Sequence, residues 1–180
     1  MRFLTKDESE AWSAAAGFSA DPPKLPGVAA EQLPHLRVAT PTAPGTVLQF
    51  CRTISRLLAP RSSCLLWVVT WGVWSSSENW HLYYRVRQSY SDYRLIHEAP
   101  GHLFLGYEEP DFVTYLELAL MSGWDVHVLP DLDYGGAETA RAFVSHDEWV
   151  LLAHRDEDTL EEWRAELGAA GHPVLPAPAA

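Results

Sequence analysis

Residues 65–74, LLWVVTWGVW, form the longest nearly apolar run in the chain and decide the fold that we expect. The run covers ten residues, whereas a helix needs about 20 apolar residues to cross a bilayer. A hydrophobic run with few polar interruptions is typical of a strand that is covered on both faces. We therefore predict a buried central strand beginning at Cys64, and no membrane span.

Further strand patterns follow this run along the chain. WHLYYRVRQSY, residues 80–90, alternates in polarity and predicts an antiparallel partner for the central strand. The Ala-Pro-Gly sequence inside HEAPGH, residues 97–102, predicts a type II turn between two more strands. The later strands that we expect are YRLIHE (93–98), HLFLGY (102–107), WDVHVLP (124–130), TARAFV (139–144) and EWVLLAH (148–154).

Helical periodicity and end signals predict four helices, over residues 7–16, 46–59, 108–122 and 156–168. Runs of strands punctuated by helices indicate an α+β fold, a mixed α/β sandwich. We expect a mostly antiparallel sheet of about six strands with about four helices packed on it. We assign residues 1–45 to an N-terminal helix and proline-rich connector, 46–170 to a single α+β domain, and 171–180 to a flexible tail.

The charge of the chain is unevenly distributed. Residues 1–100 hold ten Lys and Arg against eight Asp and Glu, whereas residues 101–180 hold three against sixteen. Residues 1–100 therefore carry a net charge of +2 and residues 101–180 a net charge of −13, which together give the −11 of the whole chain. A negative field of this size repels nucleic-acid phosphate and attracts cationic surfaces. Acidic surface also helps solubility by itself, so solubility alone remains the competing interpretation.

From this charge we predict a non-catalytic module that recognises a basic protein surface, as an immunity protein, inhibitor or adaptor does. Charge then steers the encounter, and aromatic side chains anchor it. Most of the eight tryptophans are expected to pack in the core. The candidate partner-binding residues combine acids with rings: Asp131, Asp133, Tyr134, Asp147, Glu148 and Trp149.

An alternative function is a small-ligand-binding protein or a hydrolase-like enzyme that uses a His/Asp/Glu cluster with a divalent metal. Its candidate ligands are His97, His102, His127 and His146. HEAPGH lacks the H-E-x-x-H spacing of a zinc helix, because its histidines are five residues apart and Pro100 breaks a helix. Asp125, His127 and Leu129 share one face of the strand WDVHVLP, and Asp131 and Asp133 follow at its C-terminal end, where ligands of open α/β sheets bind. A His/Asp/Glu cluster would form there if HEAPGH or SHDEW, residues 145–149, lay beside that end.

Other features exclude several classes of protein. The N-terminus MRFLTKDESE has no apolar signal region, so we expect a cytoplasmic protein. We find no phosphate-binding glycine loop and no CxxC pair, and expect no cofactor. Cys51 and Cys64 do not make a disulfide framework and are expected to be small buried hydrophobes. The expected partner is a basic protein, not a nucleic acid or a membrane, and a homo-oligomer is compatible with the sequence.

Overall fold

The structure, a computed structural model, describes residues 1–18, 33–58, 62–72, 77–131 and 140–176. Its centre is a sheet of seven strands in the order β1-β4-β3-β5-β6-β7-β2, and every pairing between them is antiparallel. The strands are β1 (Arg2–Leu4), β2 (His35–Ala39), β3 (Ser63–Thr70), β4 (Gly101–Leu105), β5 (Asp125–Asp131), β6 (Ala140–Ser145) and β7 (Trp149–His154). The predicted α+β class with a mostly antiparallel sheet is confirmed.

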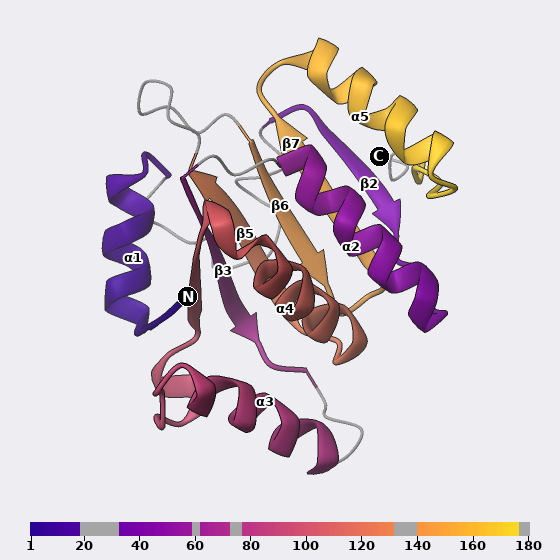
Figure 1. Ribbon diagram of the computed structural model, residues 1–180. Helices are drawn as coiled ribbons and strands as arrows, with labels where there is room; N and C mark the ends of the chain where they lie inside the picture. The colour runs from indigo at the N-terminus through magenta and orange to yellow at the C-terminus, as the bar shows by residue number, and fades with distance from the viewer. Residues whose placement is uncertain (19–32, 59–61, 73–76, 132–139, 177–180) are drawn as a thin grey trace.

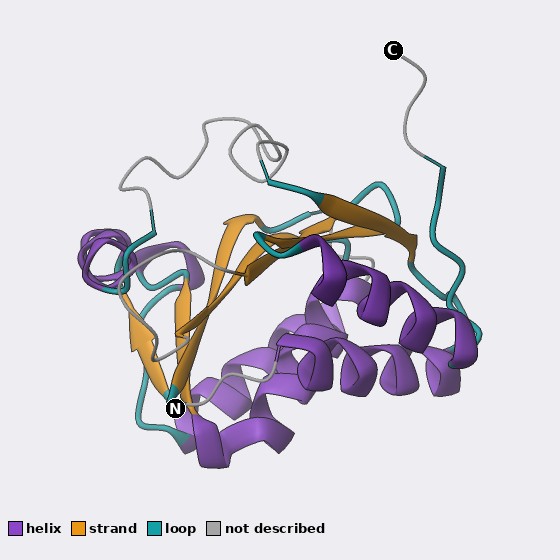
Figure 2. Cartoon of the chain, turned by 90° about the horizontal axis from the view of Figure 1, so that it is seen from above, coloured by secondary structure: helices purple, strands orange, loops and turns teal. Residues whose placement is uncertain are grey.

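The helices divide unequally between the two faces of the sheet, as Figures 1 and 2 show. Four of them supply side chains to the main core on one face, and α1 packs against the other face. The helices are α1 (Lys6–Ala15), α2 (Pro44–Leu58), α3 (Ser77–Ser89), α4 (Glu109–Met121) and α5 (Glu157–Ala169). The described part of the chain thus has one more helix than the four that we expected.

The central strand is β3, and it is buried on both faces as predicted. Leu66 and Val68 belong to the main core beneath the helices, while Leu65 and Trp67 belong to the smaller cluster beneath α1. Strand side chains alternate between the two faces, so a strand with helices on each side needs apolar residues at every position. This requirement explains the uninterrupted hydrophobic run from which the prediction began.

The prediction of a strand over residues 80–90 is wrong, because residues 80–89 belong to the helix α3 and Tyr90 lies in the turn after it. Tyr83 and Arg87, four residues apart, both face the interior of the protein. Residues i and i+4 share one face of a helix and also one face of a strand. The alternating pattern was therefore compatible with both, and the burial of a charged residue concealed the helical stripe.

HEAPGH is not the turn of a hairpin. The predicted strand over residues 93–98 does not form, because this stretch contains only the 3₁₀ segment Ile96–Glu98. β4 begins at Gly101. Gly101 is not among the glycines with positive φ, so a type II turn is absent at this position. A side chain at Gly101 would collide with Ser9 of α1, which explains the glycine by the close approach of a helix.

Three segments outside the predicted strands also contact the sheet, the first of them Arg2–Leu4, which forms β1 and pairs with β4. Residues 35–39, which we placed in the connector, form β2 and pair with β7 along its length. In the predicted tail, His172 is buried against the ring of Phe50, with ring centroids 4.9 Å apart. Val174 forms an isolated bridge with Val38. Residues 177–180 lie outside the described part of the chain.

Candidate functional site

A strongly acidic surface of the described structure is the outer side of α5, the yellow helix at the edge of the molecule in Figure 1. Asp156 caps this helix, since its carboxylate accepts a hydrogen bond from the backbone N–H of Asp158. The buried stripe consists of Leu160, Trp163 and Leu167. A helix with one apolar stripe presents its other residues to solvent, and here most of those residues are acidic.

We call this surface the α5 acidic face, and it consists of Asp156, Glu157, Asp158, Glu161, Glu162 and Glu166, all of which are exposed. Two ion pairs neutralise part of it: Arg56 of α2 lies 2.8 Å from Glu166, and Arg164 lies 3.2 Å from Glu161. Within the described residues, no ion pair engages Glu157, Asp158 or Glu162. Negative charge therefore remains uncompensated along the exposed side of the helix.

The residues that the sequence offered for partner binding do not form one surface. Asp131 ends β5, where its carboxylate accepts hydrogen bonds from the hydroxyls of Ser62 and Ser63. Asp147 and Glu148 are exposed in the turn after β6, beside the opposite end of β5. Asp133 and Tyr134, which were also candidates, lie outside the described residues.

Trp149 opens β7 and is only partly exposed. The guanidinium of Arg37 lies 4.1 Å from the centroid of its ring, on the face of the sheet opposite α5. A cation over an indole face stabilises the pair and covers the ring. The ring of Trp149 thus serves local packing between β2 and β7, and α5 itself turns its tryptophan, Trp163, toward the core.

The four candidate metal ligands lie apart. His97 is exposed in the 3₁₀ segment, and His146 is exposed in the turn between β6 and β7. His102 is buried on the helix-covered face of β4, whereas His127 is buried on the opposite face of β5. Among the residues that the structure describes, no group of three or more His, Cys, Asp or Glu side chains is arranged to hold a metal ion.

Of the residues considered for a His/Asp/Glu cluster, Asp125 and His146 make contact, but at the beginning of β5 and not at the C-terminal end where the cluster was expected. Nδ1 of His146 lies 2.8 Å and 3.0 Å from the two carboxylate oxygens of Asp125, and the backbone N–H of His146 also donates to Asp125. Its other ring nitrogen, Nε2, lies 3.5 Å from the carboxylate of Asp147. The hydrogen bond and charge of Asp125, with a contribution from Asp147, raise the pKa of His146.

This arrangement favours a structural role for His146. A general base needs a neutral imidazole with a ring nitrogen free to accept a proton from substrate. Here both ring nitrogens of His146 face carboxylates, which stabilise the protonated ring. The contact of His146 with Asp125 thus holds the β6–β7 turn against β5, which indicates a structural role for the two residues more than a catalytic one.

Sequence reasoning missed a chain of buried polar groups beneath α3. The hydroxyl of Tyr83 lies 2.7 Å from Nε2 of His102, and Arg87 donates to the same hydroxyl at 3.4 Å. Arg87 also forms a 3.0 Å ion pair with Oδ2 of Asp92, and Arg94 lies 2.9 Å from the same oxygen. The only sequence signal was the spacing of Tyr83 and Arg87, which we interpreted as that of a strand.

Burial sets the protonation of this chain. It lowers the pKa of His102 to about 3, assisted by the charge of Arg87, so the ring is neutral. Nδ1 of His102 faces the carbonyl oxygens of Leu66 and Pro100 and therefore carries the proton. Burial alone would raise the pKa of Asp92, but hydrogen bonds from Arg94 and the charge of Arg87 outweigh it and lower that pKa.

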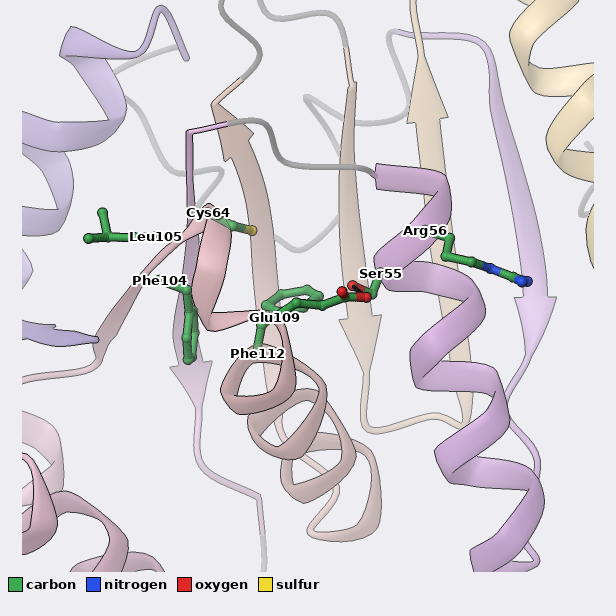
Figure 3. Close-up of a pocket in the computed structure, with 8 residues that line it drawn as sticks. Ser55, Arg56, Cys64, Phe104, Leu105, Glu109 and Phe112 are labelled. Atoms are coloured by element: carbon green, nitrogen blue, oxygen red, sulfur yellow. Dashed lines mark hydrogen bonds between the residues drawn. The ribbon is translucent and has the colours of Figure 1, made fainter.

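Sequence reasoning also missed a pocket of about 290 Å³ between α2, α4 and the ends of β3 and β4. Its lining residues are Ser55, Arg56, Cys64, Phe104, Leu105, Gly106, Glu109 and Phe112. Figure 3 shows Ser55 and Glu109 pointing toward each other, while Leu105 and Arg56 extend away from them to opposite sides. Because the lining comes from elements far apart in the chain, no local sequence pattern predicts the pocket.

Comparisons with known proteins identify no relative: no family model matches the chain, and no curated protein or solved structure matches it significantly. None of the described helices has the length and hydrophobicity needed to cross a membrane.

Proposed function

We propose that this protein binds a basic protein partner through the α5 acidic face. The supporting observation is the concentration of charge: residues 155–166 hold six carboxylates against two arginines, a net charge of −4. These carboxylates lie on the exposed side of one helix, so their fields add along a single direction. The partner's matching surface is a patch or helix rich in lysine and arginine.

The physics of this surface predicts how such a complex behaves. Exposed charges contribute little to affinity as single pairs, about 0–1 kcal/mol each, because water and salt screen them. Together they accelerate and orient the encounter with an oppositely charged protein. Since the Debye length is only about 8 Å at physiological ionic strength, the association weakens as salt is added.

The first step of the test is capture. The immobilised protein is exposed to an extract of the cells that encode it, at about 50 mM and about 500 mM NaCl, and bound proteins are identified by mass spectrometry. A basic protein retained at low salt and released at high salt is the expected result. Such a protein then enters binding titrations with three variants that each remove two negative charges.

The variants are matched in charge and differ only in place. Asp158→Asn/Glu162→Gln changes the α5 acidic face, Asp147→Asn/Glu148→Gln changes the β6–β7 turn, and Asp7→Asn/Glu10→Gln changes α1 on the other face of the sheet. We expect the first to weaken binding several-fold and the third to leave it within twofold, because only nearby charges act through salt solution. Equal weakening by all three, or capture that ignores salt, would contradict the proposal.

A further inference from the structure

The pocket between α2 and α4 combines an apolar wall with a polar edge. The apolar wall is formed by Cys64, Phe104 and Phe112, which are all buried, and the two phenyl rings meet edge to face with centroids 5.7 Å apart. A cavity of about 150 Å³ with apolar walls is known to hold benzene. The present volume of about 290 Å³ therefore fits a single ring with a short side chain.

The polar groups of the pocket gather at one side. The hydroxyl of Ser55, which is buried on α2, donates to Oε1 of Glu109 at 3.1 Å and holds that carboxylate at the edge of the apolar wall. The second carboxylate oxygen, Oε2, has no hydrogen-bond partner among the described residues. One oxygen of Glu109 is thus fixed by the protein, and the other is free to accept a hydrogen bond from a ligand.

No cation of the described chain neutralises Glu109. The nearest candidate in the lining, Arg56, forms its 2.8 Å ion pair with Glu166 and points away from Glu109 (Figure 3). The neighbouring carboxylate, Glu108, is engaged by the N-terminal amine of Met1 and by the backbone N–H of Leu105. The charge presented to a ligand at this edge is therefore negative.

We infer that this pocket binds a small organic cation, an aromatic or aliphatic ring carrying a primary ammonium group on a short chain. The ligand's ring packs against the wall formed by Cys64, Phe104 and Phe112, and its ammonium group donates a hydrogen bond to Oε2 of Glu109. Burial of the ring supplies affinity, and the charge-assisted hydrogen bond supplies selectivity for a cation. The pocket adjoins the α5 acidic face through Arg56, which pairs with Glu166, but the inference does not depend on the proposed partner.

Three probes of the same shape and different charge test the inference. They are 2-phenylethylamine, 2-phenylethanol and phenylacetate, titrated against the protein at about pH 7, where the amine is protonated and the acid ionised. Binding is followed by NMR chemical shifts of backbone amides. We expect the amine to bind about tenfold more tightly than the alcohol. The acid should bind least, and the shifts should centre on Ser55, Phe104 and Phe112.

Variants separate the charge from the shape of the pocket. Glu109→Gln should reduce the preference for the amine over the alcohol to about twofold or less, because an amide lacks the negative charge. Ser55→Leu fills the pocket and should abolish the binding of all three probes. Glu117→Gln, on the same helix but outside the lining, is the matched control and should keep the tenfold preference.

The measured quantity is the ratio of the affinities of one variant for the amine and the alcohol, so a variant need not be as stable as the wild type. Glu109 is exposed, and its exchange for glutamine is compatible with folding even where Ser55→Leu is not. The inference is overturned if no probe binds up to about 10 mM. It is equally overturned if shifts map elsewhere, or if Glu109→Gln keeps the preference for the amine. Loss of partner binding in the capture experiment would leave this result unaffected.

Discussion

The phenol hydroxyl of Tyr83 on α3 lies 2.7 Å from Nε2 of His102 on β4, and both side chains are fully buried. Because Nδ1 of His102 is directed at carbonyl oxygens, Nε2 is the acceptor and the tyrosine hydroxyl is the donor. This bond connects α3 to the sheet. Through Arg87 it also continues to Asp92, so that a helix of modest apolar character is attached to the core by polar contacts.

We predict that Tyr83→Phe destabilises the protein by about 1–3 kcal/mol. The variant keeps the ring but leaves Nε2 of His102 without its donor in a site that water does not reach. Urea unfolding followed by tryptophan fluorescence measures the change. Tyr93→Phe, which alters a tyrosine that is 76% exposed, is the matched control and should change stability by less than about 0.5 kcal/mol. Equal effects of the two variants would disprove the role of the hydroxyl.

The buried ion pair of Arg87 and Asp92 leads to a second prediction. Asp92→Ala should cost about 3–5 kcal/mol, because it leaves the guanidinium of Arg87 as an uncompensated buried charge. The control is Glu161→Ala, which breaks the exposed pair with Arg164 and should cost no more than about 1 kcal/mol. Calorimetric or urea unfolding at neutral pH compares them. A loss at Asp92 as small as that at Glu161 would show that Arg87 reaches solvent.

Buried histidines make stability depend on pH, and the largest shifts of pKa are those of His127 and His102. Burial, assisted by the charge of Arg141, lowers the pKa of His127 to about 4, and His102 titrates at about 3. Both rings are therefore neutral when folded and take up a proton on unfolding below about pH 6.5, so stability falls as pH drops from about 6.5 toward 4. Each histidine contributes at most about 1.4 kcal/mol per pH unit.

His127→Leu tests this dependence. Between about pH 6.5 and pH 4 the variant should lose less unfolding free energy than the wild type, by the amount that one histidine contributes, because leucine does not titrate. Unfolding free energies from urea titrations at several pH values give the slope. Leu151→Val, on the same face of the sheet, is the control and should lower stability by the same amount at every pH. Parallel curves for wild type and His127→Leu would refute the prediction.

The pKa of His146 is shifted in the opposite direction to those of His102 and His127, so its effect on stability has the opposite dependence on pH. Its folded pKa is raised, chiefly by the hydrogen bond to Asp125, so its contribution to stability is present below its unfolded value and disappears as pH rises through the folded value. An NMR titration of the imidazole resonances measures this pKa. We expect Asp125→Asn to lower it toward about 6.5 and Asp147→Asn to lower it less. A larger effect of Asp147→Asn would contradict the prediction, because it would show that Asp147, and not Asp125, is the main cause of the raised pKa.

Elements with a strong local pattern could be predicted from the sequence. The hydrophobic run after Cys64 predicted β3 with both faces covered, and the apolar stripe of Leu160, Trp163 and Leu167 predicted α5. The acidic character of α5 is local as well, since six carboxylates occur within eleven residues. For such features, the period of the side chains and the burial of an apolar face point to the same structure.

The helix α3 shows where local reasoning failed. Arg87 is fully buried, and a buried arginine is unexpected unless a partner is known. Its partner Asp92 is only five residues away, but the Tyr83 hydroxyl and the Phe3 ring that surround it are positioned by the fold. The strand and helix periods agree at positions 83 and 87, so the residues alone did not decide between them.

The sequence by itself determined the class of the fold, the central strand and the acidic face of α5, because each is encoded within a few consecutive residues. Only the tertiary structure decided that Ser55 and Glu109 meet beside Cys64, that Tyr83 reaches His102, and that the candidate histidines lie apart. These relationships join residues far apart in the chain. They depend on the order and register of the strands, which fix the face that each side chain occupies.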